Sequence, residues 1–399
     1  MRLVAAVVVG VCAGVVVPAG PVAAAPCLGA GSVVAGVPAE LRAYAPARLA
    51  GLATGAGVRV AVVDSGVDVR NAQLKGQVAA GRDLLHGAPD GRRDCVGHGT
   101  AVAGIIAGLP DVSTGVQGLA PGVTIVPVRV TEDTDSRGQQ EIARSRSSAD
   151  AFASAIRWAA GPADADVINI SLVMPLEDPA VRDAVAEAVR SDVVVVAAAG
   201  NGGAEAGVAY PAAYPGVIGV AAVGADGLLA GYSQPGAHVD IAAFGDQVTV
   251  LSPVRGHRSV QGTSFAAPFV SATVALLRER FPGESAREIT GRLLRSVDPA
   301  PGGPRSVAYG VGLLNPYRAL SEEAGPVVAA VPAGSPVPVV VASRGPAWER
   351  AGLFAAGGAG LAVVAGLVAV VVGRGRRRGW RAARDTSAHD TPAHDQMPG

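Results

Sequence analysis

Residues 58–68 read VRVAVVDSGVD, an apolar run that ends at Asp64 and turns at Gly66. Comparable apolar runs without period-two alternation occur at residues 123–130, 167–172, 193–199 and 217–223. Strands that are buried on both faces of a sheet have this pattern. Helical patterns lie between and after the runs, at residues 98–107, 149–160, 179–190, 264–280 and 286–294. This alternation predicts an α/β fold over residues 58–320, with a parallel sheet and helices on both of its faces.

Composition limits the function classes. The chain has 399 residues, and its 33 basic and 33 acidic side chains give a formal net charge of zero. A balanced charge argues against a nucleic-acid partner, since phosphate contacts need a basic surface. Apolar residues make up 49% of the chain, the high end of the globular range, and two terminal apolar segments supply much of this excess. Composition therefore already indicates a membrane.

The first 25 residues have the three parts of a secretory signal peptide. Arg2 is the positive region, residues 3–17 are apolar, and three alanines at 23–25 form a small-residue cleavage site. An uncleaved membrane anchor is the alternative. The segment PAGP at residues 18–21 cuts the apolar run short, which favours the signal peptide.

Cleavage would remove Cys12 and leave Cys27, in an Ala/Pro/Gly-rich extension at residues 26–57, and Cys95. In an exported protein two cysteines indicate one disulfide, and in the loop-entropy model a loop of about 70 residues closed in this way stabilises the fold by about 4 kcal/mol. Two free buried thiols are the alternative. Neither cysteine belongs to a CxxC motif or accompanies paired histidines, so a metal site is not expected here.

Residues 353–372 form a run of twenty residues without a charge or a proline, enough to span a hydrocarbon core of about 30 Å. Six arginines follow between positions 374 and 384. They predict a single-pass membrane protein with a cytoplasmic tail at 373–399 and the α/β domain outside. A buried core helix, the alternative, would not need the arginines. A Pro-rich linker at 321–350 precedes the span, and the polar segment 131–148 is expected to be an exposed loop.

Two motifs place a carboxylate at the end of a predicted strand and a histidine at the start of a predicted helix. Asp64 lies at the carboxyl end of a predicted strand, where parallel sheets have their ligand crevice, and a carboxylate there can orient a histidine. The ordinary alternative is an aspartate that forms the turn. His98 stands between two glycines at the start of a small-residue helix, where a general base could be exposed to the crevice. A capping or packing histidine is its alternative.

Two further motifs supply a hydroxyl and an amide. Ser264 in QGTSFAAP opens an apolar helix, whose dipole favours developing negative charge. A simple N-cap serine is the alternative. Asn201 ends the buried run VVVVAAAGN, where its amide could donate to an oxyanion. The alternative is a left-handed turn residue of the Asn-Gly pair.

Together, and in this order along the chain, the segments DSGVD, GHGTAVAG, AAAGN and GTSFAAP resemble the four signature segments of the subtilisin-like serine proteases, the subtilases. The resemblance covers residues 58–320. It implies that Asp64 is the orienting acid, His98 the general base and acid, Ser264 the nucleophile and Asn201 the oxyanion donor.

The segment VINISL resembles the subtilase strand whose backbone pairs with the substrate, which implies that Ser171 is a substrate-binding residue. Val173 and Met174 follow where many subtilases continue with glycines. The family's usual preferences in the S1 pocket are therefore not implied for this chain. No cofactor is implied, and no compact acidic loop indicates calcium.

The architecture resembles a narrower group, the mycosins of type VII secretion systems. It shares with them a signal peptide, no large pro-domain, a cysteine after the cleavage site, a Pro-rich linker and a single C-terminal span. A cysteine three residues before His98 and the loop at 131–148 are also similar, whereas the cysteines of a second disulfide are absent from the sequence.

This resemblance implies a membrane-anchored extracytoplasmic serine endopeptidase that processes secreted proteins and helps to hold the secretion complex together. Protein or peptide substrates, the membrane and subunits of that complex are the expected partners. Two alternatives remain open: a general surface subtilase, and a mainly structural subunit that retains the fold.

Overall fold

The computed structural model describes residues 27–87, 89–132 and 146–322, together with Val372, Arg374, Arg377 and Arg378. The chain divides into two units, Met1–Val339 and Val340–Gly399, and the first contains all the elements discussed below. In the second unit, Arg378 N donates to Arg374 O at 3.1 Å. The predicted signal peptide, and almost all of the predicted linker and membrane span, lie outside the described residues. No helix in the described ranges is long and apolar enough to cross a membrane.

A seven-stranded sheet with the strand order β2-β3-β1-β4-β5-β6-β7 forms the centre of the first unit. Every pairing in it is parallel. The strands are β1 (Arg59–Asp64), β2 (Arg82–Asp83), β3 (Thr124–Arg129), β4 (Val167–Ile170), β5 (Val194–Ala198), β6 (Val217–Val223) and β7 (Ile241–Phe244). The five predicted strands are confirmed, with bounds that differ by up to two residues. The two-residue β2 and the four-residue β7, at the sheet edges, were not predicted.

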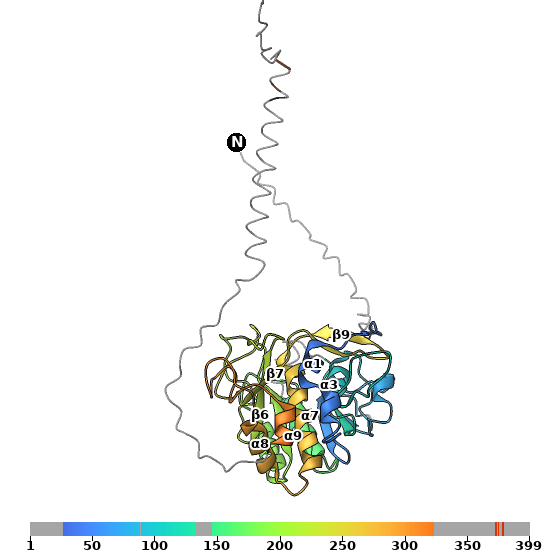
Figure 1. Cartoon of the computed structure of the whole chain (residues 1–399), viewed down its shortest axis with the longest axis vertical. Coiled ribbons are helices and arrows are strands. Elements are labelled where there is room, and N and C mark those ends of the chain that lie inside the picture. The colour runs from blue at the N-terminus through green and yellow to red at the C-terminus, as the bar shows by residue number, and fades with distance from the viewer. Residues whose placement is uncertain are drawn as a thin grey trace, which may run out of the picture. The chain divides into compact units, whose positions relative to one another are not determined.

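Helices cover both faces of the sheet, as the absence of period-two alternation predicted. Alternate residues of β5 show this, because Val195 packs into one core and Val196 into the other. On the first face lie α3 (His98–Ala107), α7 (Thr263–Arg280), α8 (Ala286–Arg295) and α9 (Pro316–Ser321), and Figure 1 shows α3, α7 and α9 in this layer. The second face is covered by α5 (Arg146–Ala160) and α6 (Pro179–Arg190).

The N-terminal extension is part of this fold. It forms α1 (Ala39–Tyr44) and α2 (Pro46–Leu49), neither of which was predicted, and Tyr44 and Leu49 are buried in the same core as α3 and α7. A hairpin of β8 (Val248–Leu251) and β9 (His257–Val260) lies beside it. Ser32 pairs with His257, and Glu40 Oε1 accepts a hydrogen bond from Thr249 N at 2.8 Å. A short 3₁₀ helix, η1 (Ala72–Leu74), lies between β1 and β2.

Parallel strands bring the predicted site residues to one edge of the sheet. Asp64 is the last residue of β1, Ser171 directly follows β4, and Asn201 lies three residues beyond β5. The helices α3 and α7, which lie side by side, begin with His98 and with Thr263–Ser264. The carboxyl edge of an open parallel sheet is where such folds bind ligands.

Candidate active site

Asp64 and His98 form a buried hydrogen-bonded pair. His98 Nδ1 lies 2.8 Å from Asp64 Oδ1 and 3.0 Å from Oδ2. Asp64 is fully buried and His98 is 8% exposed. A carboxylate accepts hydrogen bonds, so it favours the tautomer that carries its proton on Nδ1. The other ring nitrogen, Nε2, is then free to accept a proton.

The glycine after His98 allows helix α3 to approach β1 closely. A Cβ at Gly99 would collide with the Gly66 carbonyl oxygen and would stand 3.2 Å from Asp64 Oδ1. Both glycines were prominent in the sequence, and the structure shows why the two segments need them. The Asp64–His98 pair depends on this close backbone contact.

Ser264 lies in the first turn of α7 behind Gly262, whose φ of +147° is a conformation that side chains rarely adopt. A Cβ at Gly262 would stand 3.0 Å from Ser264 Oγ and 3.5 Å from Asn201 Nδ2. The serine hydroxyl and the asparagine amide therefore flank the same small space, which the glycine leaves open.

Asn201 is oriented by the residue before the serine. Its Oδ1 accepts hydrogen bonds from Thr263 N at 2.8 Å and from Thr263 Oγ1 at 3.0 Å. A backbone N–H can only donate, so the atom that faces Thr263 is the oxygen. The amide nitrogen Nδ2 points away and makes no hydrogen bond within the described part of the chain. The left-handed residue of this turn is Gly200, with a φ of +104°, and not Asn201.

Ser171 is hydrogen-bonded to the backbone of Ser264. Its hydroxyl donates to the Ser264 carbonyl oxygen at 2.8 Å and accepts from Asn169 Nδ2 at 2.9 Å. The side chain is buried, so a contact between Ser171 and a substrate would come from its backbone. The substrate-binding role of Ser171 stays a prediction.

His98 is linked to the serine helix through Phe265, whose ring centroid lies 4.9 Å from that of His98. Among the described residues, no hydrogen bond joins Ser264 Oγ to His98. In many serine enzymes this bond becomes short and well aligned only when the substrate is in place. The structure thus brings Asp64 and His98 together directly, and brings Ser264 and Asn201 together around Gly262.

A disulfide ties the N-terminal extension to the histidine loop. Cys27 and Cys95 are bonded across a sequence separation of 68 residues, and Leu28 N donates to Cys95 O at 2.8 Å. Cys95 lies three residues before His98. A Cβ at Gly97 would press on Leu28 and on Pro253, so the extension packs directly against the turn that leads to His98.

One buried acid near this pair was missed by sequence reasoning. Asp94 directly precedes Cys95, and burial raises the pKa of its carboxyl group. Its position in DCVGHGT, four residues before His98, was visible in the sequence, but its partners lie on segments that only folding brings together.

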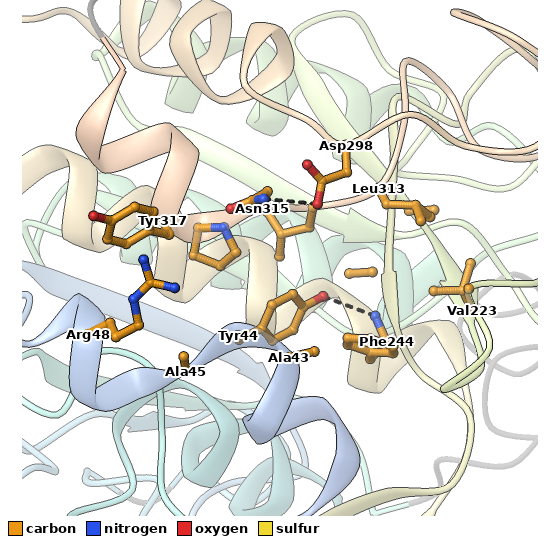
Figure 2. A pocket seen from close by; sticks show the side chains of 15 residues that line it. Ala43, Tyr44, Ala45, Arg48, Val223, Phe244, Asp298, Leu313, Asn315 and Tyr317 are labelled. Atoms are coloured by element: carbon orange, nitrogen blue, oxygen red, sulfur yellow. Dashed lines mark hydrogen bonds between the residues drawn. The ribbon is translucent and has the colours of Figure 1, made fainter.

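A cavity of about 220 Å³ lies at the edge strand β7, and none of Asp64, His98, Asn201 and Ser264 lines it. Figure 2 shows Tyr44, Arg48 and Tyr317 on its walls. The Arg48 guanidinium lies 4.1 Å from the centroid of the Tyr317 ring. Tyr44 accepts a hydrogen bond from Phe244 N at 3.2 Å. The cavity thus lies where the N-terminal extension meets the sheet edge, and it is separate from the candidate site. The described residues include no cluster of three or more side chains suited to hold a metal ion.

A parallel α/β sheet with an Asp–His pair, a helix-start serine and an asparagine amide at its carboxyl edge is the arrangement of an α/β serine peptidase. Comparison with known proteins narrows this class. The model of the subtilase family, Peptidase S8, matches residues 55–312. The chain therefore belongs to the subtilase family and is a serine peptidase.

Individual relatives agree with this assignment. Mycosin-4 of Mycobacterium tuberculosis is 35% identical over 375 residues, which cover 82% of this chain and 79% of that protein. Subtilisin DY of Bacillus licheniformis is 36% identical over 264 residues, 65% of this chain and 90% of the relative.

Solved structures of mycosins are also similar. The MycP3 protease of the type VII (ESX-3) secretion system has a TM-score of 0.65 and 31% identity, and the match covers 75% of this chain and 93% of MycP3. MycP1 of Mycobacterium smegmatis has a TM-score of 0.66 and 27% identity, with 80% of this chain and 92% of MycP1 covered. The chain is thus a mycosin-like subtilase.

Proposed function

We propose that the chain is a membrane-anchored serine endopeptidase that works outside the cytoplasm with Asp64, His98 and Ser264 as its catalytic triad. The hydrogen bond of 2.8 Å between His98 Nδ1 and Asp64 Oδ1 is the observation that carries the catalytic part of this proposal. It gives the histidine the tautomer that a general base for a serine needs.

The reaction follows from these positions. Ser264 Oγ attacks the carbonyl carbon of the scissile peptide bond while His98 Nε2 takes its proton, and Asp64 stabilises the imidazolium that forms. The carbonyl oxygen becomes an oxyanion beside Asn201 Nδ2, which has no other hydrogen-bond partner among the described residues. His98 then protonates the leaving amine, which leaves an acyl-enzyme on Ser264. A water molecule attacks this acyl group while His98 Nε2 takes its proton, and His98 returns the proton to Ser264 Oγ as the acid product leaves.

The site also holds the serine in place. The Ser264 carbonyl is hydrogen-bonded by Ser171, and Thr263 is held by Asn201 on the other side. These bonds fix the first turn of α7, so the hydroxyl and the amide keep their relative position during the reaction. Such preorganisation supplies a large part of the rate in enzymes of this kind.

The membrane anchor is proposed from the sequence. Residues 1–25 have the form of a signal peptide, and residues 353–372, which precede six arginines, have the length of a membrane span. Both signals give the same topology, with the peptidase domain outside and residues 373–399 in the cytoplasm. Protease protection in membrane vesicles tests this, since the C-terminal tail and the peptidase domain should be digested from opposite sides.

We further propose a role in a type VII secretion system, because two of the similar solved structures, MycP3 and MycP1, come from such systems. Protein substrates and subunits of the secretion complex would then be its partners. A deletion strain complemented with wild type or with Ser264→Ala separates a proteolytic role from a structural role in the secretion complex. Loss of processing and of secretion with the mutant supports a proteolytic role, whereas full rescue of secretion would show that the chain acts mainly as a structural subunit.

A further inference from the structure

Asp94 joins the two segments that carry Asp64 and His98. Its Oδ1 accepts from Ser65 Oγ at 2.9 Å and from Gly97 N at 2.7 Å. Its Oδ2 accepts from Thr100 N at 2.8 Å and from Thr100 Oγ1 at 2.5 Å. Ser65 directly follows Asp64, while Gly97 and Thr100 stand on either side of His98. One carboxylate therefore spans the gap between β1 and the start of α3.

The two backbone N–H groups can only donate, and a second contact favours donation to Asp94 by each of the two hydroxyls. Ser65 Oγ accepts from Gly99 N at 3.0 Å, and Thr100 Oγ1 accepts from Asp68 N at 2.9 Å. Each hydroxyl can thus direct its proton to Asp94. The carboxyl group then receives four donors, two backbone N–H groups and two hydroxyls, and its ionised form satisfies all of them.

Asp94 is buried, and it interacts electrostatically with Arg258 and with the Asp64 carboxylate. Arg258 does not replace any of the four donors, since its Nη2 donates to Gly97 O at 2.6 Å. Asp94 therefore binds the N–H group of Gly97, and Arg258 binds its carbonyl oxygen. Gly97 directly precedes His98.

Resting on the proposed catalytic role of the Asp64–His98 pair, we infer that Asp94 is a positioning residue, which keeps His98 Nδ1 in hydrogen-bond contact with Asp64 by clamping the backbone on both sides of the pair. Asp94 does not itself touch His98, Asp64 or a substrate. Its effect on the reaction is exerted through its hydrogen bonds to residues 65, 97 and 100.

Asp94→Asn is the sharpest variant, because it changes neither volume nor shape. Whichever way the amide is turned, its NH₂ group faces one backbone N–H and one hydroxyl, and a backbone N–H cannot reverse its role. We expect kcat to fall by about 10²-fold, with KM changed by less than about twofold, because small displacements of a catalytic group have effects of this size. Labelling of Ser264 by an organophosphonate should slow in parallel.

A direct readout of the pair does not depend on turnover. The proton shared between His98 Nδ1 and Asp64 should give a far-downfield ¹H resonance in the full-length wild-type chain. In Asp94→Asn this resonance should shift or broaden. Ile289→Ala, which lowers stability from a buried position in α8, is the control and should keep both the resonance and kcat.

Ser65→Ala provides a second variant in case Asp94→Asn does not fold. It removes one donor to Asp94 and the acceptor of Gly99 N, and should lower kcat less, by about tenfold. The double variant should lose less than the product of the single losses, because both act through one network. The inference is overturned if Asp94→Asn or Ser65→Ala folds and keeps both the wild-type kcat and the wild-type resonance. A variant that differs from the wild type only in a lower unfolding temperature would assign Asp94 a purely structural role.

If the wild type is inactive but still shows the resonance, the proposed function is contradicted. The positioning role of Asp94 is then tested by the resonance of the variants alone.

Discussion

His98 Nδ1 lies 2.8 Å from Asp64 Oδ1 although the two residues are 34 positions apart and belong to different elements, the end of β1 and the start of α3. The pair is buried, and the helix approaches the strand through Gly99. Its geometry makes each member of the site separately testable.

Replacement of Asp64 by Asn should lower kcat by about 10⁴-fold, because an amide allows the wrong histidine tautomer to form. Steady-state hydrolysis of a peptide substrate measures the loss. Asp178→Asn is the matched control, since Asp178 caps α6 through Ala180 N and Val181 N, and asparagine caps a helix equally well. Comparable activity of the two variants would show that Asp64 does not orient the base.

Replacement of Asn201 by Asp retains the acceptor for Thr263 and removes the amide donor. We expect kcat to fall by about 10²–10³-fold with a smaller effect on KM, as the loss of one oxyanion donor does in subtilisin. Asn201→Ala should lower kcat by a similar factor, and it should also remove the acceptor of the two Thr263 hydrogen bonds. A wild-type kcat in Asn201→Asp would show that the Asn201 amide does not stabilise the oxyanion.

The Cys27–Cys95 disulfide should stabilise the domain by about 4 kcal/mol in the loop-entropy model. The double variant Cys27→Ser/Cys95→Ser should therefore unfold at a lower denaturant concentration, and reductant should destabilise the wild type but not the variant. Non-reducing peptide mapping should recover the two cysteines linked. Free thiols at both positions in the purified protein would contradict this link.

Acidification should weaken the attachment of the N-terminal extension at His257. Its Nδ1 accepts a hydrogen bond from Val34 N at 3.0 Å, and Nε2 faces Gln73 Oε1 at 2.9 Å, so the neutral ring fits the site. Burial lowers the pKa of His257 below its ordinary value of about 6.5. As the pH falls below that value, the unfolded chain binds a proton that the folded chain does not, and the free energy of unfolding decreases.

Chemical denaturation at pH 7.5 and at pH 5.5 measures this decrease. In His257→Asn, whose side-chain oxygen can still accept from Val34 N, the decrease should be smaller than in the wild type. Equal decreases in both proteins would mean that His257 is not a source of the pH dependence.

The central strands could be predicted from sequence because burial on both faces leaves mostly apolar residues in them, as in β5 and β6. The helices α3, α6 and α7 were equally clear from their patterns. By contrast, α1 and α2 have six and four residues, too short for a helical period, and tertiary burial of Tyr44 and Leu49 stabilises them.

The site shows the same division. Asp64, His98, Asn201 and Ser264 each stand in a segment whose glycines are visible in the sequence. The role of Asp94 was not predictable, because its four donors come from residues 65, 97 and 100, and only the fold brings Ser65 to the histidine loop.

Labelling by an organophosphonate probe tests the central claim most directly. The wild-type chain should react at a single serine and lose peptidase activity in proportion, and Ser264→Ala should neither label nor hydrolyse a peptide substrate. Tandem mass spectrometry should place the adduct on Ser264. An adduct on another residue, or labelling and hydrolysis that persist in Ser264→Ala, would contradict the assignment of Ser264 as the nucleophile.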